Sequence, residues 1–307
     1  MKAAYIEEHG GPEVLKYGDV VDPVGGTGEV IVDVHAASVN GADWKVRSGA
    51  SGTITNFPYV LGRDISGVVS AVGDGVDDLQ VGDAVFGVCA GGQEGAYAEM
   101  IAMKSAILAK KPDSLSHVDA ASLALIGLTA LISIEDTLHL KSGETILIQG
   151  GAGGVAGFAI QLAKHIGARV ITTASAANHD YLRGLGADEI IDYNVQDFTE
   201  VVSDCDAVFD TAGGDVTQRS FAVLKPGGRA AFIASGGKAP ESPRGDVTSL
   251  RPAVGRDRPH LERILELVAA GAVQTPEITE YALSDAVEAH RVSEARHLRG
   301  KLVFKIR

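Results

Sequence analysis

A glycine cluster between a short apolar run and an amphipathic segment is the feature that most restricts the fold of this chain. The stretch TILIQGGAGGVAGFAIQLAKHIG, residues 145–167, holds five glycines within eight residues. The apolar run is typical of a strand and the following segment of a helix, so the glycines form a strand-to-helix turn. Gly151, Gly153 and Ala156 fit the pattern G-x-G-x-x-A of a dinucleotide-binding turn.

Each small residue of that pattern has its own physical purpose. The first glycine permits the tight turn, the second lets the backbone approach a pyrophosphate, and the small third residue lets helix and strand pack closely. The pyrophosphate then lies on the free N–H groups and positive dipole end of the helix. Glycine-rich turns also occur for structural reasons alone, so the motif predicts a cofactor site only inside a βαβ unit.

The chain after Pro112 supplies that context. Residues 117–138 have the composition and length of a helix, and strands and helices then alternate. Such alternation indicates a parallel sheet covered by helices on both faces, the doubly wound Rossmann type of α/β fold. We expect strands at residues 145–149, 169–173, 189–191, 207–210 and 229–234, and helices from Gly154 and at 178–185, 216–224 and 259–271.

The chain before Pro112 has a different pattern, of short alternating or β-branched segments separated by Gly, Asp and Pro turns. This pattern predicts a mainly-β domain with strands at residues 29–39, 64–73 and 83–88.

The length of 307 residues suggests two domains, since a single core seldom grows to that size. The final residues, 301–307, read as a strand again and are expected to return to the first domain. We therefore expect a mainly-β domain of residues 1–115, completed by 275–307, and a Rossmann domain of residues 116–274.

Charge and cysteine content exclude several classes of function. A formal net charge of −13 without a basic run argues against nucleic acid or an anionic membrane as a partner. The N-terminus lacks the apolar core of a secretory signal, and no window approaches the length of a membrane span. Cys89 and Cys205 lie far apart without a CxxC partner, so they cannot form a disulfide framework or a cysteine zinc site. These features predict a soluble, cytoplasmic protein.

The end of the second strand of the Rossmann domain bears on the choice of cofactor. An NAD-binding domain usually places an acidic residue there, about twenty residues after the fingerprint, to hold the ribose diol. In this chain Ala174 and Ser175 occupy the place. With no carboxylate there to repel a 2′-phosphate, NADP(H) is favoured over NAD, and a permissive pocket that takes either cofactor is the alternative.

Nine motifs in order along nearly the whole chain resemble those of the medium-chain dehydrogenase/reductase superfamily, and within it the zinc-independent, zeta-crystallin-like NADPH:quinone oxidoreductases. Any one of the motifs is unspecific, but nine in this order are a strong signature. The motifs are SVNGADWKVRSG (38–49), VLGRDISGVV (60–69), VGDAVFG (81–87), GAYAE (95–99), GLTAL (127–131), GGAGGVAGFAIQLAK (150–164), LGADEIIDY (185–193), LKPGGR (224–229) and GKLVFKI (300–306).

The resemblance implies that the first domain is GroES-like and that the active site lies in the cleft between the two domains. Zinc alcohol dehydrogenases of the superfamily hold a catalytic metal with a Cys, a His and a further Cys or Asp. Asn40 stands at the first cysteine position, and Gly62-Arg63-Asp64 replaces the glycine-histidine-glutamate motif. Arginine has no lone pair for a metal, and the family's four-cysteine lobe is missing, so we expect no metal site.

The resemblance also assigns cofactor contacts residue by residue. Relatives often place a lysine between the two residues that meet the adenosine 2′-phosphate, and Ala177 stands there instead, although Asn178 or Arg183 could compensate. The implied contacts are Asn40 and Thr129 near the nicotinamide, Gly153, Gly154 and Val155 at the pyrophosphate with Gly151 in the turn before them, Ser175 and Tyr193 at the 2′-phosphate, Ala212 and Gly213 along the adenosine, and Ile233, Ala234 and Ser235 facing the nicotinamide.

Lys45 is the candidate for a catalytic side chain beside Asn40. It stands where many quinone reductases carry a tyrosine, and its ammonium would steady negative charge on the acceptor oxygen; a solvated surface lysine is the alternative. Trp44 either stacks on a flat acceptor or anchors the β domain. Arg63 and Asp64 either act on substrate or, as we expect, form a local ion pair that holds the turn. Asp43 and Arg47 are expected to pair with each other at helical i, i+4 spacing.

Three functions remain open. Without a metal to polarise a carbonyl, quinones and conjugated enones are better hydride acceptors than simple ketones, since the charge spreads over the π-system. The leading expectation is therefore hydride transfer from NADPH to a quinone, in a homodimer or homotetramer. The alternatives are reduction of enones or enoyl thioesters, and non-catalytic NADPH binding as in crystallin relatives. The acceptor depends on loops such as residues 87–95.

Overall fold

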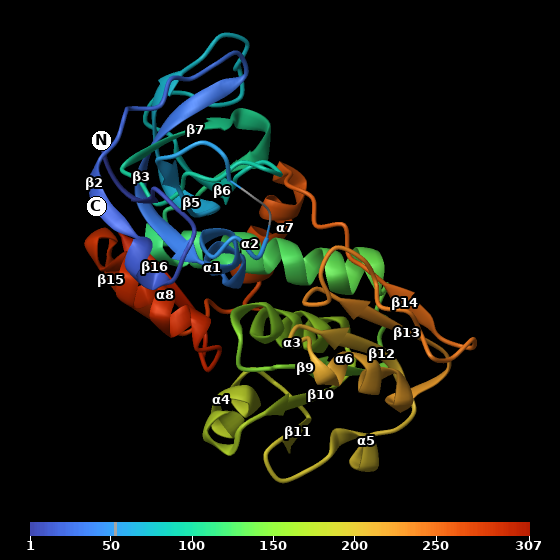
Figure 1. The fold of residues 1–307 in the computed structure, drawn as a ribbon. Coiled ribbons are helices and arrows are strands. Elements are labelled where there is room, and N and C mark those ends of the chain that lie inside the picture. Colours follow the sequence, from blue (N-terminus) through green and yellow to red (C-terminus); the bar gives the residue numbers. More distant parts are fainter. Residues whose placement is uncertain (52–53) are drawn as a thin grey trace. The chain divides into compact units, whose positions relative to one another are not determined.

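The computed structural model describes residues 1–51 and 54–307, and the chain divides into two compact units (Figure 1). The division falls inside two helices, α2 (His117–Leu131) and α7 (Arg258–Ala269). Unit 1 comprises Met1–Leu125, Arg256–Arg263 and Thr275–Arg307, and unit 2 comprises Ile126–Gly255 and Ile264–Gln274.

Unit 1 is built on a largely antiparallel seven-stranded sheet with the order β15-β16-β3-β5-β6-β8, to which β7 adds by pairing with β3. A smaller sheet has the order β2-β1-β4. The strands are β1 (Lys2–Ile6), β2 (Lys16–Asp19), β3 (Glu29–Val39), β4 (Tyr59–Val60), β5 (Asp64–Val72), β6 (Ala84–Val88), β7 (Met100–Lys104), β8 (Leu108–Lys110), β15 (Ile278–Ala282) and β16 (Lys301–Lys305).

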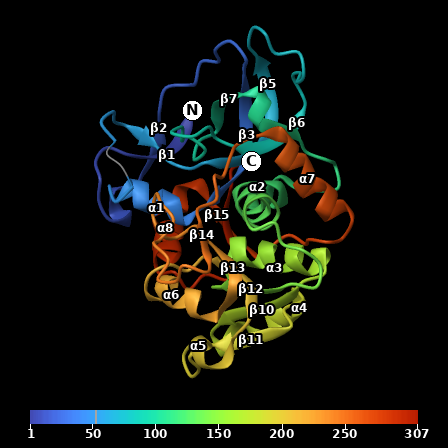
Figure 2. The same cartoon turned by 90° about the vertical axis from the view of Figure 1, so that its right-hand side faces the viewer.

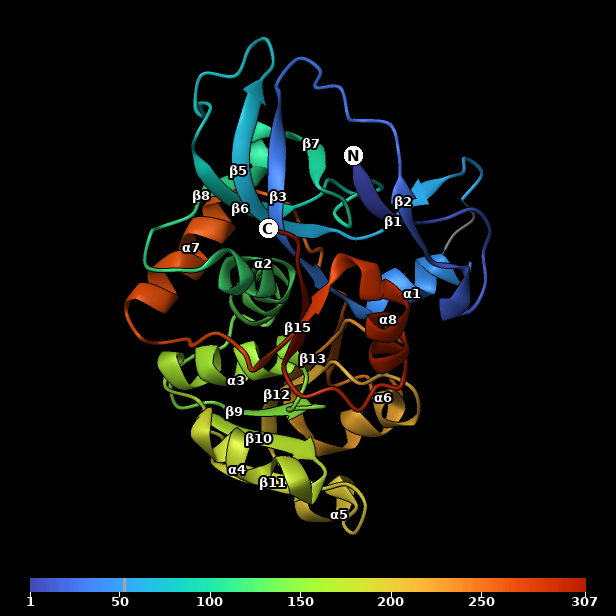
Figure 3. The ribbon, with the colours of Figure 1, turned by 90° about the vertical axis from the view of Figure 1, so that its left-hand side faces the viewer.

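The long strand β3 organises unit 1, as Figure 3 shows. Its residues alternate between buried and half-buried over the first half and are buried over the second, as an alternating pattern predicts. The C-terminal strand β16 pairs antiparallel with β3, so that Leu302 lies opposite Val39. Two short helices complete the unit, α1 (Gly41–Arg47) directly after β3, and α8 (Ala286–Glu294).

Unit 2 is a six-stranded parallel sheet with the order β11-β10-β9-β12-β13-β14, which confirms the doubly wound fold (Figure 2). Continuous apolar runs such as TILIQ form its strands because a parallel sheet is buried on both faces. Its elements are β9 (Thr145–Gln149), α3 (Gly154–Ile166), β10 (Arg169–Ala174), α4 (His179–Gly184), β11 (Glu189–Asp192), α5 (Phe198–Val201), β12 (Cys205–Asp210), α6 (Asp215–Arg219), β13 (Leu224–Phe232) and β14 (Thr248–Leu250).

Some element boundaries in unit 2 differ from the expectation. The expected helix at 216–224 is the short helix α6 followed by a 3-10 turn, Ser220–Val223, and β13 already begins at Leu224. Phe221 of that turn packs on Phe232 of β13, with ring centroids 5.2 Å apart. Core packing therefore draws a segment of helical composition into a tighter turn.

The expectation that no segment reaches the length of a membrane span is wrong for one helix. α2 and the π-helical turn that continues it, His117–Thr137, contain an 18-residue window with a mean hydropathy of 1.7, enough by length and composition to cross a bilayer. Of the most apolar window, 78% is buried inside the protein. The core helix of a globular protein passes the same test, so the high hydropathy is accounted for by burial.

Candidate active site

The glycine turn lies at the carboxyl end of β9, where the strand order of the sheet reverses between β9 and β12. Ligands of doubly wound sheets bind at this switch point. The hydroxyl of Thr211, just after β12, donates to the carbonyl of Gln149 at 2.7 Å. This hydrogen bond ties the loop after β12 to the start of the glycine turn.

Gly151 and Gly153 differ in what surrounds them. A Cβ on Gly151 would lie 2.3 Å from Oγ1 of Thr172, so the absence of a side chain there serves the packing of the turn on β10. A Cβ on Gly153 would meet only the carbonyl oxygen of Gly150, at 3.5 Å. Gly153 caps α3, and the first helical hydrogen bond runs from Gly157 N to its carbonyl at 2.8 Å. The N–H groups of residues 154–156 therefore precede the helical ladder and suit an anion.

Two further predicted segments lie at the neighbouring strand ends. The buried carboxylate of Asp210, the last residue of β12, accepts hydrogen bonds from the backbone N–H groups of Ala212 and Gly213, both at 2.9 Å. A Cβ on Gly213 would come within 2.7 Å of the Cβ of Ala234, which follows β13. The structure thus brings 212–213 and the segment containing Ile233, Ala234 and Ser235 together.

The predicted 2′-phosphate residues lie at the ends of β10 and β11. Ser175 follows β10, and its hydroxyl accepts a 3.1 Å hydrogen bond from the Asn178 side chain. Tyr193 follows β11 and is 53% exposed. Arg183, considered as a compensating cation, pairs with Asp180 at 2.5 Å.

A carboxylate also lies at this edge of the sheet, and the sequence argument, which used only the end of the second strand, did not include it. Asp192, the last residue of β11, is the register partner of Ala174 at the end of β10. Hydrogen bonds from the backbone and side chain of Asn194, and from the backbone of Ala176, lower the pKa of Asp192. A negative charge therefore lies close to Ser175.

Thr129, the predicted contact beside the nicotinamide, lies on α2 and is largely buried. Its carbonyl accepts a 2.6 Å hydrogen bond from the hydroxyl of Ser133 one turn later.

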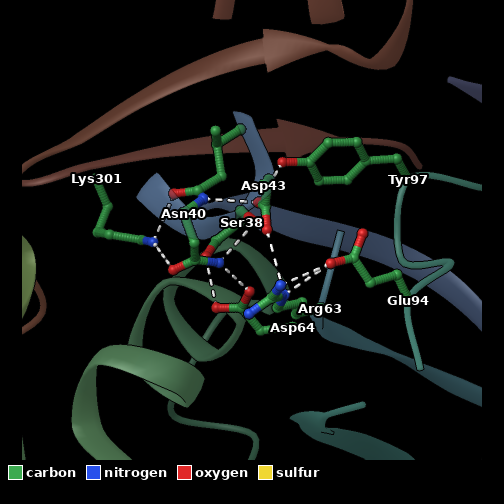
Figure 4. Close-up of polar contacts among 9 residues, drawn as sticks. Ser38, Asn40, Asp43, Arg63, Asp64, Glu94, Tyr97 and Lys301 are labelled. Carbon is green, nitrogen blue, oxygen red and sulfur yellow. Dashed lines mark hydrogen bonds and ion pairs between the residues drawn. The ribbon is translucent and has the colours of Figure 1, made fainter. Parts of the chain in front are cut away.

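Asn40 lies in a buried polar network of unit 1 (Figure 4). Its side-chain carbonyl accepts a 2.8 Å hydrogen bond from the amine of Lys301, which also donates to the carbonyl of Val39 at 2.7 Å. Its Nδ2 donates to Asp64 at 2.5 Å, and the second oxygen of Asp64 accepts from the hydroxyl of Ser38 at 2.6 Å. Both ends of the Asn40 amide are therefore held in one orientation.

Lys301 is only 4% exposed, an unusual place for an ammonium group. Burial lowers its pKa, while the carboxylates of Asp64 and Asp43 favour the charged form. A buried charge persists where it is hydrogen-bonded and compensated. The ammonium of Lys301 and the carboxylate of Asp64 bind opposite ends of the Asn40 amide, and each compensates the charge of the other.

Asp43 extends the network into α1. Its Oδ2 accepts from the backbone N–H of Asn40 at 2.8 Å and from the hydroxyl of Tyr97 at 2.6 Å. Burial raises the pKa of Asp43 to about 6, and Arg63, whose Nε lies 3.7 Å from Oδ1, opposes the shift.

Two expected ion pairs are wrong. Arg63 forms an ion pair with Glu94 at 2.8 Å, while the carboxylate of Asp64 accepts hydrogen bonds from Ser38 and Asn40. Arg47 does not pair with Asp43. Its fully buried guanidinium contacts Glu294 at 2.7 Å and the ring of His290 at 3.1 Å, both on α8. Long-range partners in the interior prevail here over the weak attraction of neighbours on one helix turn.

The catalytic candidate Lys45 lies with its amine 5.6 Å from the ring centroid of Trp44. The guanidinium carbon of Arg296 is 5.4 Å from the same centroid. Cations thus cover the Trp44 ring inside unit 1, an arrangement that fits an anchoring role for the tryptophan.

The donor set around Asn40 does not fit a metal ion. Arg63 occupies one of the two presumed ligand positions, and Lys301 is hydrogen-bonded to Asn40, which occupies the other. Both side chains offer N–H donors and no lone pair for a metal. Among residues 1–51 and 54–307, no three His, Cys, Asp or Glu side chains form a group that could hold a metal. No step of the chemistry is therefore assigned to a metal.

The sequence reasoning missed Lys301, Glu94 and Tyr97. A lysine at the start of the apolar strand KLVFK is the one local signal for Lys301, since a charged residue in a buried strand needs a partner. Nothing in the local sequence points from Glu94 to Arg63, which lies 31 positions earlier.

Comparison with known proteins agrees with this architecture. Residues 26–113 match the alcohol dehydrogenase GroES-like domain family, and residues 185–304 match the zinc-binding dehydrogenase family. The NADPH-dependent alkenal/one oxidoreductase of Arabidopsis thaliana is 33% identical, over 99% of this chain and 79% of its own length.

Solved structures agree over the whole chain. The quinone oxidoreductase of Coxiella burnetii is 36% identical with a TM-score of 0.92, covering 100% of this chain and 99% of its own. The quinone oxidoreductase of Escherichia coli, solved in complex with NADPH, is 27% identical with a TM-score of 0.91 and full coverage of both chains.

A GroES-like domain joined to a Rossmann domain defines the class as an NAD(P)H-dependent oxidoreductase. The chain belongs to the quinone oxidoreductases of the medium-chain dehydrogenase/reductase superfamily.

Proposed function

We propose that this protein transfers hydride from NADPH to a quinone or a similar conjugated carbonyl acceptor, without a metal. The single observation that supports this most is the turn at Gly153. The turn lies at the switch point of the sheet, and the first N–H groups of α3 have no partner in the helical hydrogen-bond ladder. Gly153 has no side chain that would block an anion from reaching them.

The residues of unit 2 bind the cofactor in this proposal. Gly151 packs the turn, Gly153, Gly154 and Val155 hold the pyrophosphate, and Thr129 contacts the nicotinamide end. Ala212 and Gly213 line the adenosine, and Ile233, Ala234 and Ser235 the nicotinamide. When bound, NADPH supplies the hydride, and the protein contributes binding, orientation and exclusion of water.

In unit 1 we assign to Asn40 the positioning of the nicotinamide end, and to Lys45 charge stabilisation at the acceptor oxygen. The network of Lys301 and Asp64 holds the Asn40 amide rigid. A quinone or enone needs no Lewis acid because its π-system spreads the incoming charge, in agreement with a donor set unsuited to zinc.

NADP(H) is the proposed cofactor, with Ser175 and Tyr193 at the 2′-phosphate. The NADPH complex of the E. coli relative supports this choice, and Asp192 opposes it. We expect the preference for NADPH over NADH to be modest.

A second activity, reduction of the carbon–carbon double bond of enones, is supported by the name of the Arabidopsis relative, an alkenal/one oxidoreductase. An enoyl thioester is the less suitable substrate, since its carrier favours a basic rim and the net charge is −13. Non-catalytic NADPH binding is the alternative from another class. A cytoplasmic homodimer or homotetramer remains our proposal for location and assembly.

The deciding experiment is NADPH oxidation, followed by absorbance, with 1,4-benzoquinone, methyl vinyl ketone and crotonyl-CoA. We expect turnover with the first two, unchanged after exhaustive chelation, and less than stoichiometric zinc by elemental analysis. NADPH binding without turnover of any acceptor would favour the non-catalytic alternative, and activity lost with a removable zinc would contradict the proposal.

A further inference from the structure

A pocket of about 280 Å³ lies in unit 1 beside the Asn40 network, and we call it the Arg63 pocket. It lies between α1, β4 and the loop that follows β6. Apolar and charged side chains line it, among them Val46, Ile54, Tyr59, Arg63, Glu94 and Arg256. A flat conjugated molecule with one polar oxygen suits such a lining.

Glu94 is the unusual side chain of this lining. It is only 5% exposed, and its Oε1 accepts a 2.9 Å hydrogen bond from Nε of Arg63 and lies 2.8 Å from NH2 of the same guanidinium in an ion pair. Its Oε2 is buried and has no hydrogen-bond partner among residues 1–51 and 54–307. A buried carboxyl oxygen without a partner is costly, so this atom requires either a proton or a ligand.

Burial keeps a fraction of Glu94 protonated near pH 7. Burial raises the pKa of Glu94 to about 7, and the neighbouring carboxylate of Asp43 adds to the shift, while Arg63 opposes it. Arg256 is a second cation in the lining. Tyr59, Cys89 and Tyr97 lie nearby and stay neutral near pH 7, because burial raises their pKa values. The carboxylate of Asp64 also acts on Arg63 and Arg256.

We propose that the Arg63 pocket binds the carbonyl acceptor and that Oε2 of Glu94 donates the proton that completes its reduction. The inference rests on the proposed hydride transfer and adds the second half of the reaction. An enone that takes up a hydride from NADPH at its β-carbon becomes an enolate. The O–H bond of Glu94 then breaks, its proton forms a C–H bond at the α-carbon of the enolate, and Glu94 is left as a carboxylate.

The two arginines make this transfer favourable. Before it, the guanidinium groups of Arg63 and Arg256, which line the pocket, stabilise the enolate and take the role proposed above for Lys45. After it, the new carboxylate of Glu94 is already hydrogen-bonded to Arg63. Solvent restores the proton once the product leaves. Glu94 and Arg63 therefore return to their starting state with no reactant other than this proton.

An enone and a quinone should depend on Glu94 to different degrees. An enolate needs a positioned acid, and general acid catalysis typically contributes about 100-fold or more. A hydroquinone anion is much less basic and takes its proton readily from water. With methyl vinyl ketone we expect Glu94→Gln to lower kcat by about 100-fold, and with 1,4-benzoquinone by less than about threefold.

The pH profile separates proton donation from a structural role. With methyl vinyl ketone, kcat/KM of the unaltered protein should fall as pH rises through about 7, where Glu94 loses its proton. Glu94→Gln should remove this dependence, and Glu94→Asp should restore it in part. Glu277→Gln, which removes a carboxylate from the surface pair with Arg299, is the matched control and should leave both acceptors unaffected.

The two proposals fail in different ways. No oxidation of NADPH by either acceptor in the unaltered protein refutes the proposed function. Turnover of both acceptors with a flat pH profile for the enone refutes Glu94 as the proton donor, even if Glu94→Gln does not fold. Equal losses for enone and quinone in a folded Glu94→Gln protein refute it as well, because they indicate a damaged pocket.

Discussion

The amine of Lys301 donates a 2.8 Å hydrogen bond to the side-chain carbonyl of Asn40, 261 positions earlier in the chain. The last strand of the protein thereby fixes a residue at the end of β3. Asp64, on β5, holds the other end of the same amide. Three strands of one sheet, joined by pairing of β16 with β3 and of β3 with β5, meet in this contact.

Replacing Lys301 should lower the free energy of unfolding, although the substitution removes a charge that is buried away from water. Lys301→Met leaves the carbonyls of Val39 and Asn40 without their donor and Asp64 without its nearby cation. We expect urea denaturation to show a loss of about 3 kcal/mol in the free energy of unfolding. The double variant Lys301→Met/Asp64→Asn should lose less than the sum of the single variants, since it removes both charges.

Lys305→Met on the same strand is the control for this series. Its amine is exposed and lies 3.9 Å from Glu280, a pair that contributes little. We expect a change within about 0.5 kcal/mol. A Lys301→Met protein as stable as Lys305→Met would show that the network is not needed for folding.

Substitutions at two glycines of the glycine turn, Gly153 and Gly151, should separate cofactor binding from folding. Gly153→Val places a side chain where a pyrophosphate would approach, yet its Cβ meets no protein atom closer than 3.5 Å. We expect a nearly unchanged melting temperature without cofactor and at least a tenfold weaker NADPH affinity by fluorescence, about 1.4 kcal/mol.

Gly151→Val is the matched variant, two positions away. Its Cβ would lie 2.3 Å from Oγ1 of Thr172, so the free energy of unfolding should fall by about 1–3 kcal/mol. A folded Gly153→Val protein that binds NADPH like the unaltered chain would show that this turn is not the cofactor site.

The charges at the ends of β10 and β11 should set the cofactor preference. Ser175→Asp adds a second carboxylate beside Asp192 and should reverse a preference for NADPH, since it repels a 2′-phosphate. Asp192→Asn should strengthen that preference. Calorimetric titration with NADPH and NADH measures both shifts. Identical NADPH-to-NADH ratios in all three proteins would place the 2′-phosphate elsewhere.

The free energy of unfolding of the protein without cofactor should depend on pH because of Glu94. Its pKa in the folded protein is about 7, above the reference of 4.5, so the folded state holds more protons between these values. The free energy of unfolding therefore falls as pH rises from about 4.5 to 7, by up to about 3 kcal/mol from this group. Comparing Glu94→Gln with the unaltered chain by urea denaturation across this window isolates the effect. A difference that stays constant with pH would contradict the raised pKa.

Much of the fold could be predicted because its causes are local. The apolar run of β9, the glycines after it and the spacing of apolar residues on α3 each act over a few residues, and together they define a strand, a turn and a helix. The repeat of that pattern along the chain then implies a parallel sheet, which the structure confirms. The place of the glycine turn at the switch point follows from the same pattern.

Side-chain partners could not be predicted in the same way. Asp43 and Arg47 have the spacing of a helical ion pair, but such a pair contributes only about 0.3–0.5 kcal/mol. Tyr97 and Glu294, which lie far along the chain, outcompete it because they meet these charges in the interior, where an unpaired charge is costly.

The sequence by itself determined most strands and helices of the parallel sheet and the glycine turn that follows β9, although core packing shortened the helix expected at 216–224. Only the tertiary structure decided which buried polar groups meet: Lys301 with Asn40, and Glu94 with Arg63. The physical reason is that hydrophobic periodicity is read from neighbours in the chain. The partner of a buried charge is instead whichever group the sheet brings within hydrogen-bonding distance, at any separation in sequence.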